Sequence, residues 1–125
     1  MTGSGTWTVV GHYIPGFSAM SEAEAAAHHG DVVRFAEREA QSAEAHCDAP
    51  TYSARTVAAE PYFETEYRIP YWSLPPLRDS EDVTLLEVRC DGSPWSVLGA
   101  LLIMIAADRA LAPWDGVFFE LVRER

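Results

Sequence analysis

The two ends of the chain constrain the fold more than any other part of the sequence. Residues 7–13 alternate as a β-strand does, and the tryptophan at position 7 assigns its face to the protein interior. Residues 117–123 alternate in the same way, with Arg123 on the more apolar face. The inward sets are then Trp7, Val9, Gly11 and Tyr13 in the first strand and Val117, Phe119, Leu121 and Arg123 in the last, with His12 and Phe118 on the opposite faces. The sequence therefore predicts that Trp7 and Arg123 stack.

The Gly5-Thr6-Trp7 opening, with Arg123 late in the last strand, resembles the signature of the calycin superfamily, which includes the lipocalins and the fatty-acid-binding proteins. In these families the two side chains stack and close one end of a β-barrel. The resemblance implies a divergent bacterial-type member: a single antiparallel lipocalin-like β-barrel that holds a small hydrophobic molecule. The chain lacks the C-terminal arginine and tyrosine pair that holds a carboxylate in fatty-acid-binding proteins, which argues against fatty acid as the ligand.

Length and composition fit one globular domain. The chain has 125 residues, of which 48% are hydrophobic and 22% charged, and this is ordinary usage for a folded protein. We expect a flexible tail at 1–4 and one β-barrel domain at 5–125. The fold class is mainly β with one or two short helices.

Local signals divide this domain into short elements. Ser21 and Glu24 form a capping box that predicts a helix over 22–29, and Glu60-Pro61 predicts the start of a second helix. The alanine-rich stretch 40–49 leaves its connection ambiguous, and three prolines make 70–76 irregular. Two Asp-Gly pairs, at 91–92 and 115–116, predict tight turns. The expected strands are 32–37, 51–58, 83–90, 95–106 (paired or bent around Gly99), 110–114 and 117–123.

Charge limits the partners. The formal net charge of −10 repels phosphate backbones and anionic bilayers, so we expect neither nucleic acid nor membrane as a partner. The longest apolar run, 97–107, is shorter than the roughly 20 residues that a membrane-spanning helix needs. A basic protein partner remains compatible with the charge, and no cofactor is expected.

Cys47 and Cys90 form an even pair beside predicted strands, and both precede an aspartate. The sequence predicts that they lie close in space, either as one disulfide or as two reduced core cysteines. No leader with basic, apolar and small-residue parts is visible at the N-terminus. A bridged pair with a removed leader would indicate a periplasmic or secreted protein, and otherwise a cytoplasmic one is expected.

Aromatic side chains supply the candidates for a ligand site, because they combine a large apolar area with a polar group at one end. They gather at two irregular segments that we expect to cover the mouth of the barrel, and near the late strands. Ordinary core packing is the competing interpretation. The candidates are Tyr13, Phe17, Met20, Tyr67, Tyr71, Trp72, Trp95 and Trp114.

Signals for catalysis or metal binding are weaker. Glu87 and Arg89 share one strand face and form either an acid with its electrostatic partner or an exposed ion pair, and Glu120 on the last strand is a further candidate. His12, His46 and the pair at 28–29 lack the spacing of a zinc motif, so no metal is expected. His12, with parity opposite to Trp7, is predicted at the surface.

Three function classes follow from these patterns. The first is a lipocalin-like carrier or sensor of a small hydrophobic molecule, and the second is an acidic interaction, inhibitor or immunity module. The third is a small barrel enzyme such as a cyclase. The interior discriminates between them: an empty apolar cavity favours the first, a filled core the second, and a cavity with a buried carboxylate or histidine the third.

Overall fold

The computed structural model describes residues 4–124, and it is mainly β with an antiparallel sheet, as the sequence predicts. Of the predicted flexible tail, residues 1–3 lie outside the described residues. The helices are α1 (Glu22–Ala26) and α2 (Ala59–Glu66), and two 3₁₀ turns, η1 (Tyr71–Ser73) and η2 (Pro75–Leu77), follow α2. The strands are β1 (Gly5–Tyr13), β2 (Val32–Phe35), β3 (Glu39–Gln41), β4 (His46–Asp48), β5 (Thr51–Ala58), β6 (Asp82–Cys90), β7 (Ser93–Pro94), β8 (Leu101–Ala106), β9 (Arg109–Trp114) and β10 (Val117–Arg123).

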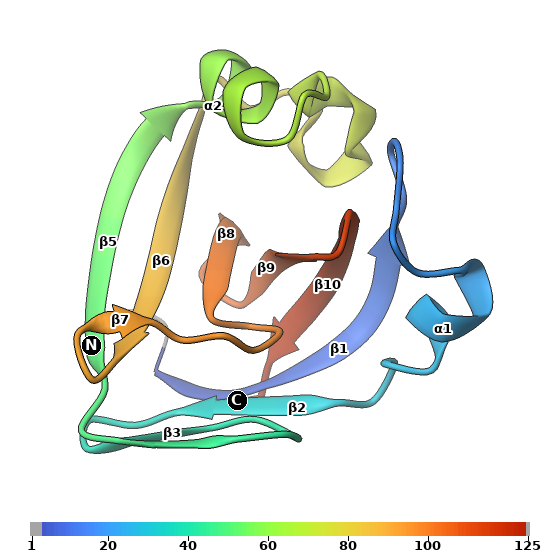
Figure 1. Ribbon diagram of the computed structural model, residues 1–125. Coiled ribbons are helices and arrows are strands. Elements are labelled where there is room, and N and C mark those ends of the chain that lie inside the picture. The colour runs from blue at the N-terminus through green and yellow to red at the C-terminus, as the bar shows by residue number, and fades with distance from the viewer. Residues whose placement is uncertain (1–3, 125) are drawn as a thin grey trace.

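The strands form one strongly curled sheet in the order β4-β3-β2-β1-β10-β9-β8-β6-β5, with β7 paired to β6. In Figure 1, β5 and β6 rise on one side of the curl and β1 on the other, and α2 with the 3₁₀ turns lies at one end. Every pairing is antiparallel, and β8, β9 and β10 follow one another as the predicted meander.

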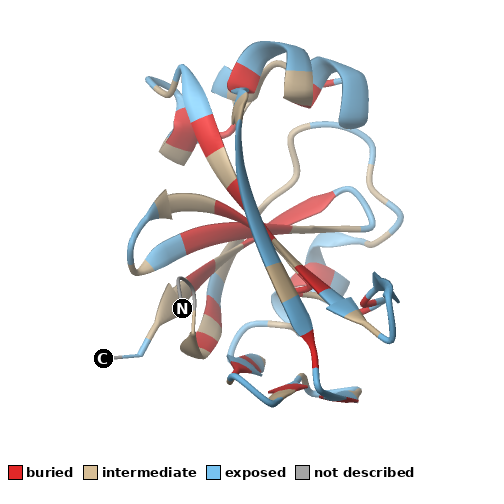
Figure 2. Cartoon of the chain, turned by 90° about the vertical axis from the view of Figure 1, so that its left-hand side faces the viewer, coloured by how far each residue is buried: buried red, intermediate tan, exposed pale blue. Residues whose placement is uncertain are grey.

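The predicted closed barrel is wrong, because the sheet is an open half-barrel. Its edge strands β4 and β5 follow each other in the chain, yet no hydrogen-bonded ladder joins them in the described part of the chain. The two residues between them force a corner: Ala49 has φ 53° and Pro50 has no amide proton to donate. Figure 2 shows the result at the front, where β5 is exposed along most of its length.

The first and last strands lie side by side, and Trp7 is directly opposite Arg123 in their register. Trp7 is fully buried, and Cζ of Arg123 lies 5.7 Å from the centroid of its ring. The guanidinium also donates to the carbonyl of Ser4 at 3.1 Å. The stacking that the sequence predicts for these two side chains is therefore present.

Both faces of the sheet carry buried side chains, so the protein has two cores. Alternate residues of β10 divide between them: Val117 and Phe119 enter the first core, whereas Phe118 enters the second. Phe118, which the sequence places on the face opposite to Arg123, is 2% exposed, so this face of β10 is buried as well. The second core lies beneath α2, which contributes Ala59 and Phe63, and beneath the two 3₁₀ turns, where Leu77 of η2 and Leu74 between the turns are buried.

A β-bulge changes which side chains of β1 face the first core. The register between β1 and β10 shifts between Val9 and Gly11, which leaves Val10 as an extra residue. An extra residue moves every later side chain to the other face. His12, predicted at the surface, is therefore only 12% exposed, and its ring centroid lies 6.2 Å from that of Phe119. Tyr13, predicted to face inward with Trp7, packs against the second core.

The connection between β7 and β8 fills the inside of the curl (Figure 1). The predicted strand 95–106 is correct only from Leu101 onward, and the residues before it form an irregular segment whose side chains Trp95 and Val97 are buried in the first core. Gly99, at φ +98°, brings this segment against β2, where an added Cβ would lie 3.0 Å from Val33. This segment has the apolar composition of a strand but makes only isolated backbone hydrogen bonds to Val88 of β6, from Trp95 at 3.1 Å and to Ala100 at 2.9 Å, and this explains the error.

The local helix and turn signals hold. Ser21 and Glu24 form the predicted capping box at the start of α1, although the helix ends at Ala26 instead of position 29. Both Asp-Gly pairs form hairpin turns with positive φ at each residue, 56° and 79° in the first pair and 53° and 85° in the second. These values are those of type I′ turns, whose twist matches that of the flanking strands.

We expect Gly116→Ala to destabilise the fold by about 2 to 5 kcal/mol. Gly116 has φ +85°, and a Cβ there would meet the carbonyl oxygen of Phe17 and lie 2.8 Å from Cα of Ser18. Gly92 holds the same place in the other Asp-Gly turn, with open space around it. Gly92→Ala should cost only the backbone strain, about 1 to 2 kcal/mol. Urea unfolding compares the two variants, and equal losses would contradict the role of the Phe17 contact.

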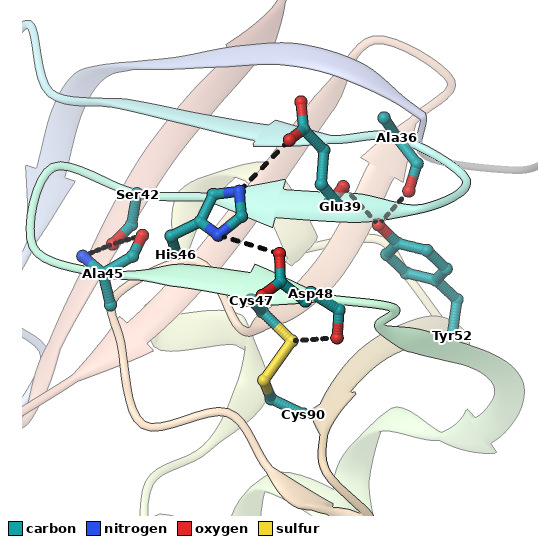
Figure 3. The surroundings of a disulfide bond; sticks show 9 residues. All are labelled: Ala36, Glu39, Ser42, Ala45, His46, Cys47, Asp48, Tyr52 and Cys90. Carbon is teal, nitrogen blue, oxygen red and sulfur yellow. Dashed lines mark hydrogen bonds and ion pairs between the residues drawn. A yellow bond between two sulfur atoms is a disulfide. The ribbon is translucent and has the colours of Figure 1, made fainter.

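Cys47 on β4 and Cys90 on β6 form a disulfide, with their Cα atoms 5.9 Å apart, so their predicted proximity is confirmed (Figure 3). The bridge joins one edge strand to the neighbour of the other edge strand. Tyr52 of β5 supports the same corner, because its hydroxyl donates to the carbonyl of Ala36 at 2.6 Å. A covalent link and a hydrogen bond thus hold together the edges that no ladder pairs.

Within residues 4–124, neither helix has the length and apolar character to cross a bilayer.

Candidate functional site

The candidate site is an open groove of about 320 Å³ where both cores reach the surface, which we call the aromatic groove. The end of α2 supplies Tyr67, and the β9–β10 hairpin supplies Trp114 and Phe118. The irregular segment inside the curl supplies Trp95. The remaining lining residues are Val97, Ala100, Leu101, Pro113, Asp115 and Gly116.

A second hollow of about 290 Å³ adjoins the aromatic groove and shares Tyr67, Gly116 and Phe118 with it. The rings of Tyr67 and Phe118 meet edge to face with their centroids 5.0 Å apart, so they form a common wall. Phe17, on the rim of the second hollow, is 95% exposed, and Arg68 also lines it.

The aromatic groove contains one charged side chain at neutral pH, the carboxylate of Asp115 in the hairpin turn. The other ionisable group is the phenol of Tyr67, whose pKa is raised by burial and by its hydrogen bond to the Tyr62 hydroxyl, 3.2 Å away. The phenol therefore stays neutral and keeps a hydroxyl for hydrogen bonding. Chemically, the groove offers aromatic faces, apolar surface and one negative charge.

The raised pKa of Tyr67 predicts a loss of stability at alkaline pH. A phenol whose pKa is higher in the folded protein than in the unfolded chain binds its proton more tightly when folded, so stability falls as the pH rises above about 10. Above pH 10, we expect Tyr67→Phe to make the fall of the free energy of unfolding with pH less steep, by as much as about 1.4 kcal/mol per pH unit. Urea unfolding of the variant and the wild type at pH 7 and above pH 10 provides the comparison. An unchanged alkaline slope would contradict this origin.

Three of the ligand candidates from the sequence meet in the aromatic groove, namely Tyr67, Trp95 and Trp114. Phe17 lies at the adjoining hollow. The structure does not bring the other four to the groove lining. Met20 packs against the first core and Tyr13 against the second, while Tyr71 and Trp72 lie on η1, where Trp72 is 59% exposed.

The catalytic candidates lie apart from the groove lining. Glu87 and Arg89 form an ion pair of 3.0 Å along β6, as one of the two sequence interpretations has it. Glu120 accepts from the guanidinium of Arg109 at 2.8 Å and from the Tyr13 hydroxyl at 3.0 Å. Burial and the Glu120 carboxylate raise the pKa of the Tyr13 phenol. Each of these carboxylates thus has a cationic partner of its own.

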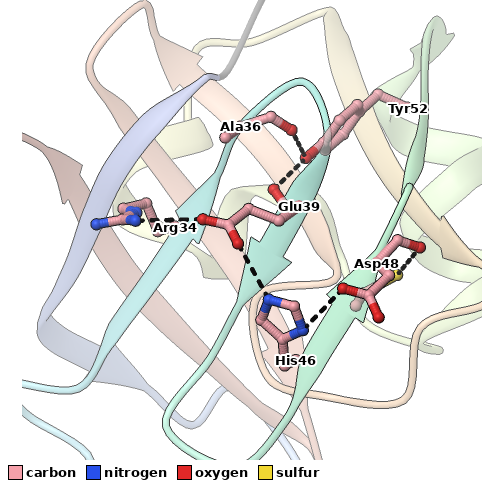
Figure 4. Close-up of polar contacts among 7 residues, drawn as sticks. Arg34, Ala36, Glu39, His46, Asp48 and Tyr52 are labelled. Atoms are coloured by element: carbon pink, nitrogen blue, oxygen red, sulfur yellow. Dashed lines mark hydrogen bonds and ion pairs between the residues drawn. The ribbon is translucent and has the colours of Figure 1, made fainter.

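Three of the four histidines form two polar networks that the sequence does not reveal, and the fourth, His28, contacts the carboxylate of Asp31 at 2.8 Å. His12 lies between His29 and Glu22, with ring nitrogens 2.8 Å from the first and 2.7 Å from the carboxylate of the second. On β4, His46 contacts the carboxylates of Glu39 at 3.1 Å and Asp48 at 3.3 Å (Figure 4). Residues 4–124 contain no group of three or more histidine, cysteine, aspartate or glutamate side chains that could hold a metal ion.

The inside of the curl offers little room for a ligand. Trp95 and Val97 occupy it, and the crevice left between Val97, Leu121 and β2 measures about 20 Å³. This is the space that one water molecule requires. The inside of the curl therefore lacks room for a small molecule, whereas the aromatic groove has a volume of about 320 Å³.

Comparison of the chain with protein-family models, curated proteins and solved structures gives no match. The curled antiparallel half-barrel is compatible with a calycin-like fold. The contact between Trp7 and Arg123 is the local feature on which that resemblance depends.

Sequence reasoning missed Phe118, Leu101 and Pro113 as lining residues. The alternation places Phe118 on the face opposite to Arg123. Only the position of α2 over that face shows that Phe118 forms part of the groove wall. The signal in the sequence was the second Asp-Gly turn, because Trp114 and Pro113 precede it and Phe118 follows it. A tight turn flanked by large apolar side chains on both strands gathers them at one hairpin tip.

Proposed function

We propose that the protein binds a small apolar molecule in the aromatic groove and that it is a divergent calycin-like carrier or sensor. The observation that carries this proposal is the convergence of Tyr67, Trp95, Trp114 and Phe118 around about 320 Å³. Ligand sites typically span about 300 to 1,000 Å³ and combine apolar walls with a few polar groups. The proposal moves the ligand from the barrel interior, which the sequence favoured, to the end of the sheet.

The energetics suit a modest ligand. Burial of apolar surface contributes about 25 cal/mol per Å², from which the costs of association are subtracted. Two indole rings and a phenol ring offer such surface with few rotatable bonds, which limits the entropy lost on binding. An aromatic ligand the size of naphthalene matches the groove in volume and in chemistry.

Titration with 2-naphthol, followed through the indole N–H signals in NMR spectra, tests this function. We expect the signals of Trp95 and Trp114 to shift in a saturable manner and Trp114→Ala to weaken binding several-fold. Trp72→Ala is the matched control, because Trp72 is 59% exposed on η1 and does not line the groove. Shifts spread evenly over all four tryptophans, or no shift at the highest soluble concentration, would contradict the proposal.

An acidic interaction module for a basic protein is the second candidate. It is favoured by the net charge of −10 and by the packing of Trp95 and Val97 inside the curl. Native mass spectrometry of the protein purified from its own source separates the two candidates. A small-molecule adduct supports the carrier, and a stoichiometric complex with a basic protein supports the interaction module.

The disulfide supports a proposal about compartment. Cys47 and Cys90 are bridged, and structural disulfides persist in oxidising environments such as the periplasm or the outside of the cell. We therefore propose that the protein resides in such a compartment. Alkylation of free thiols in intact cells tests this: the native protein should remain unlabelled until it is reduced, and labelling of both cysteines before reduction would contradict it.

A further inference from the structure

The charge and ring content of the aromatic groove point to the class of its ligand. Ten residues line the groove; four of them carry aromatic rings, one carries a carboxylate and none carries a positive charge. The faces of aromatic rings are electrostatically negative and attract cations, most strongly in tryptophan. Asp115 adds a full negative charge to the same wall. The carboxylate and the faces of the aromatic rings in the lining therefore favour a positive ligand.

Of the two tryptophan rings, that of Trp114 is the more accessible, because Trp95 is 8% exposed and packs in the first core. Tyr67 and Phe118 use each other as ring partners at 5.0 Å, whereas Trp95 and Trp114 have no ring partner within the described residues. Both indoles nevertheless line the groove. Their π faces are thus not engaged by another aromatic side chain of the protein.

We propose that the ligand of the aromatic groove is an organic cation, such as a substituted ammonium group on an apolar body. This rests on the function proposed above and specifies its ligand class. The ammonium group lies against Trp114 and the Asp115 carboxylate, and the apolar body lies along Leu101 and Phe118. Quaternary ammonium groups are the ligands that aromatic cages with a carboxylate recognise.

The charge of the whole molecule acts in the same direction. A net charge of −10 attracts cations and repels anions before contact, and this raises the local concentration of a cationic ligand. Arg68 is the opposing charge nearest in the sequence to the groove lining, and it lines the adjoining hollow, beyond the wall formed by Tyr67 and Phe118. An anion held by Arg68 is therefore the competing outcome in the experiment below.

Three meta-substituted phenols, of which the cation and the neutral compound share one shape, separate charge from hydrophobicity. They are (3-hydroxyphenyl)trimethylammonium, its neutral isostere 3-tert-butylphenol, and the anion 3-hydroxybenzoate, titrated at pH 6.5 and low salt with the tryptophan indole signals as the readout. The neutral compound costs less to remove from water, so it binds more tightly wherever the site lacks electrostatic preference. We expect the cation to bind about five- to tenfold more tightly than the neutral compound. Added salt should reduce this preference.

Two variants in the groove lining and one control variant outside it show which residues cause the preference for the cation. Asp115→Asn keeps the shape and suits the first position of a type I′ turn, and we expect it to weaken cation binding about two- to fivefold without changing the binding of 3-tert-butylphenol. Asp91→Asn removes the same charge from the other Asp-Gly turn, outside the groove lining, and should leave both affinities unchanged. Trp114→Leu keeps an apolar wall but should weaken cation binding by a similar factor.

The results distinguish this inference from the proposed function. If 3-tert-butylphenol binds as tightly as the cation, or 3-hydroxybenzoate binds more tightly, the groove still binds apolar molecules but the cation assignment is wrong. An equal loss from Asp115→Asn and Asp91→Asn would also overturn it, because the effect would then belong to the net charge. If neither the neutral compound nor the cation perturbs Trp95 and Trp114, the proposed function fails together with the inference.

Discussion

Replacing Trp7 with alanine should reduce the free energy of unfolding by about 3 to 5 kcal/mol. Trp7 is fully buried in the first core, and its pairing with Arg123 joins the first and last strands of the chain. Truncation removes the apolar contacts of the indole and leaves a cavity that the surrounding strands fill only in part. A domain of this size commonly has only about 5 to 15 kcal/mol of stability, so the variant should be close to unfolding at room temperature.

Chemical denaturation with two control variants tests this expectation. Trp72→Ala removes the same side chain from an exposed position and should change stability by no more than about 0.5 kcal/mol. Arg123→Leu keeps the aliphatic packing and removes the cation, so its loss should stay within the range of about 0.5 to 2 kcal/mol that a cation and a ring contribute. A cost below about 1 kcal/mol for Trp7→Ala would contradict the central position of this residue.

The elements that the sequence predicts correctly are those with a local cause. Residues 51–58 and 117–123 form strands with the predicted limits, because residue composition in the first and alternation in the second are properties of each strand by itself. The two Asp-Gly turns and the Ser21 capping box depend on four or fewer neighbouring residues. The contact between Trp7 and Arg123 spans the chain, and it was predictable because both ends show the same face pattern.

The errors arise where distant parts of the chain decide the structure. The bulge at Val10 leaves no mark in the alternation, yet it turns His12 toward the first core and Tyr13 toward the second. The prediction of a closed barrel was wrong at Ala49 and Pro50, because these two residues turn the chain between β4 and β5 so that the two strands do not pair. Whether a buried apolar segment such as 95–100 pairs as a strand depends on the space left by other strands.

The candidate site was predictable only in its residue types. The sequence indicated aromatic side chains near the late strands, and Tyr67, Trp95 and Trp114 do line one groove. Its location required knowledge of the second core, because α2 brings Tyr67 against Phe118 from a position far away in the chain. Trp95 and Val97 occupy the space where an interior cavity was expected. Composition alone does not show whether such a space is filled by the protein's own side chains or left open for a ligand.

Removal of the disulfide should cost about 4 kcal/mol. Cys47 and Cys90 are separated by 43 residues, and closing a loop of this length removes that much conformational freedom from the unfolded chain. The loss should also appear locally. β3 and β4 have three residues each, and without the bridge their outer side is held mainly by the Tyr52 hydroxyl. Their amide protons should therefore exchange faster than those of β1 and β10.

The test compares the wild type with the double variant Cys47→Ala and Cys90→Ala, each with and without a phosphine reductant. Alanine is preferred to serine because Cys47 is 1% exposed, and a hydroxyl there would add the cost of a buried polar group. The reductant should lower the stability of the wild type nearly to that of the double variant and leave the variant unchanged. A loss below about 1 kcal/mol would mean that hydrogen bonds and packing alone hold the open edges of the sheet, and that the half-barrel is rigid without its covalent link.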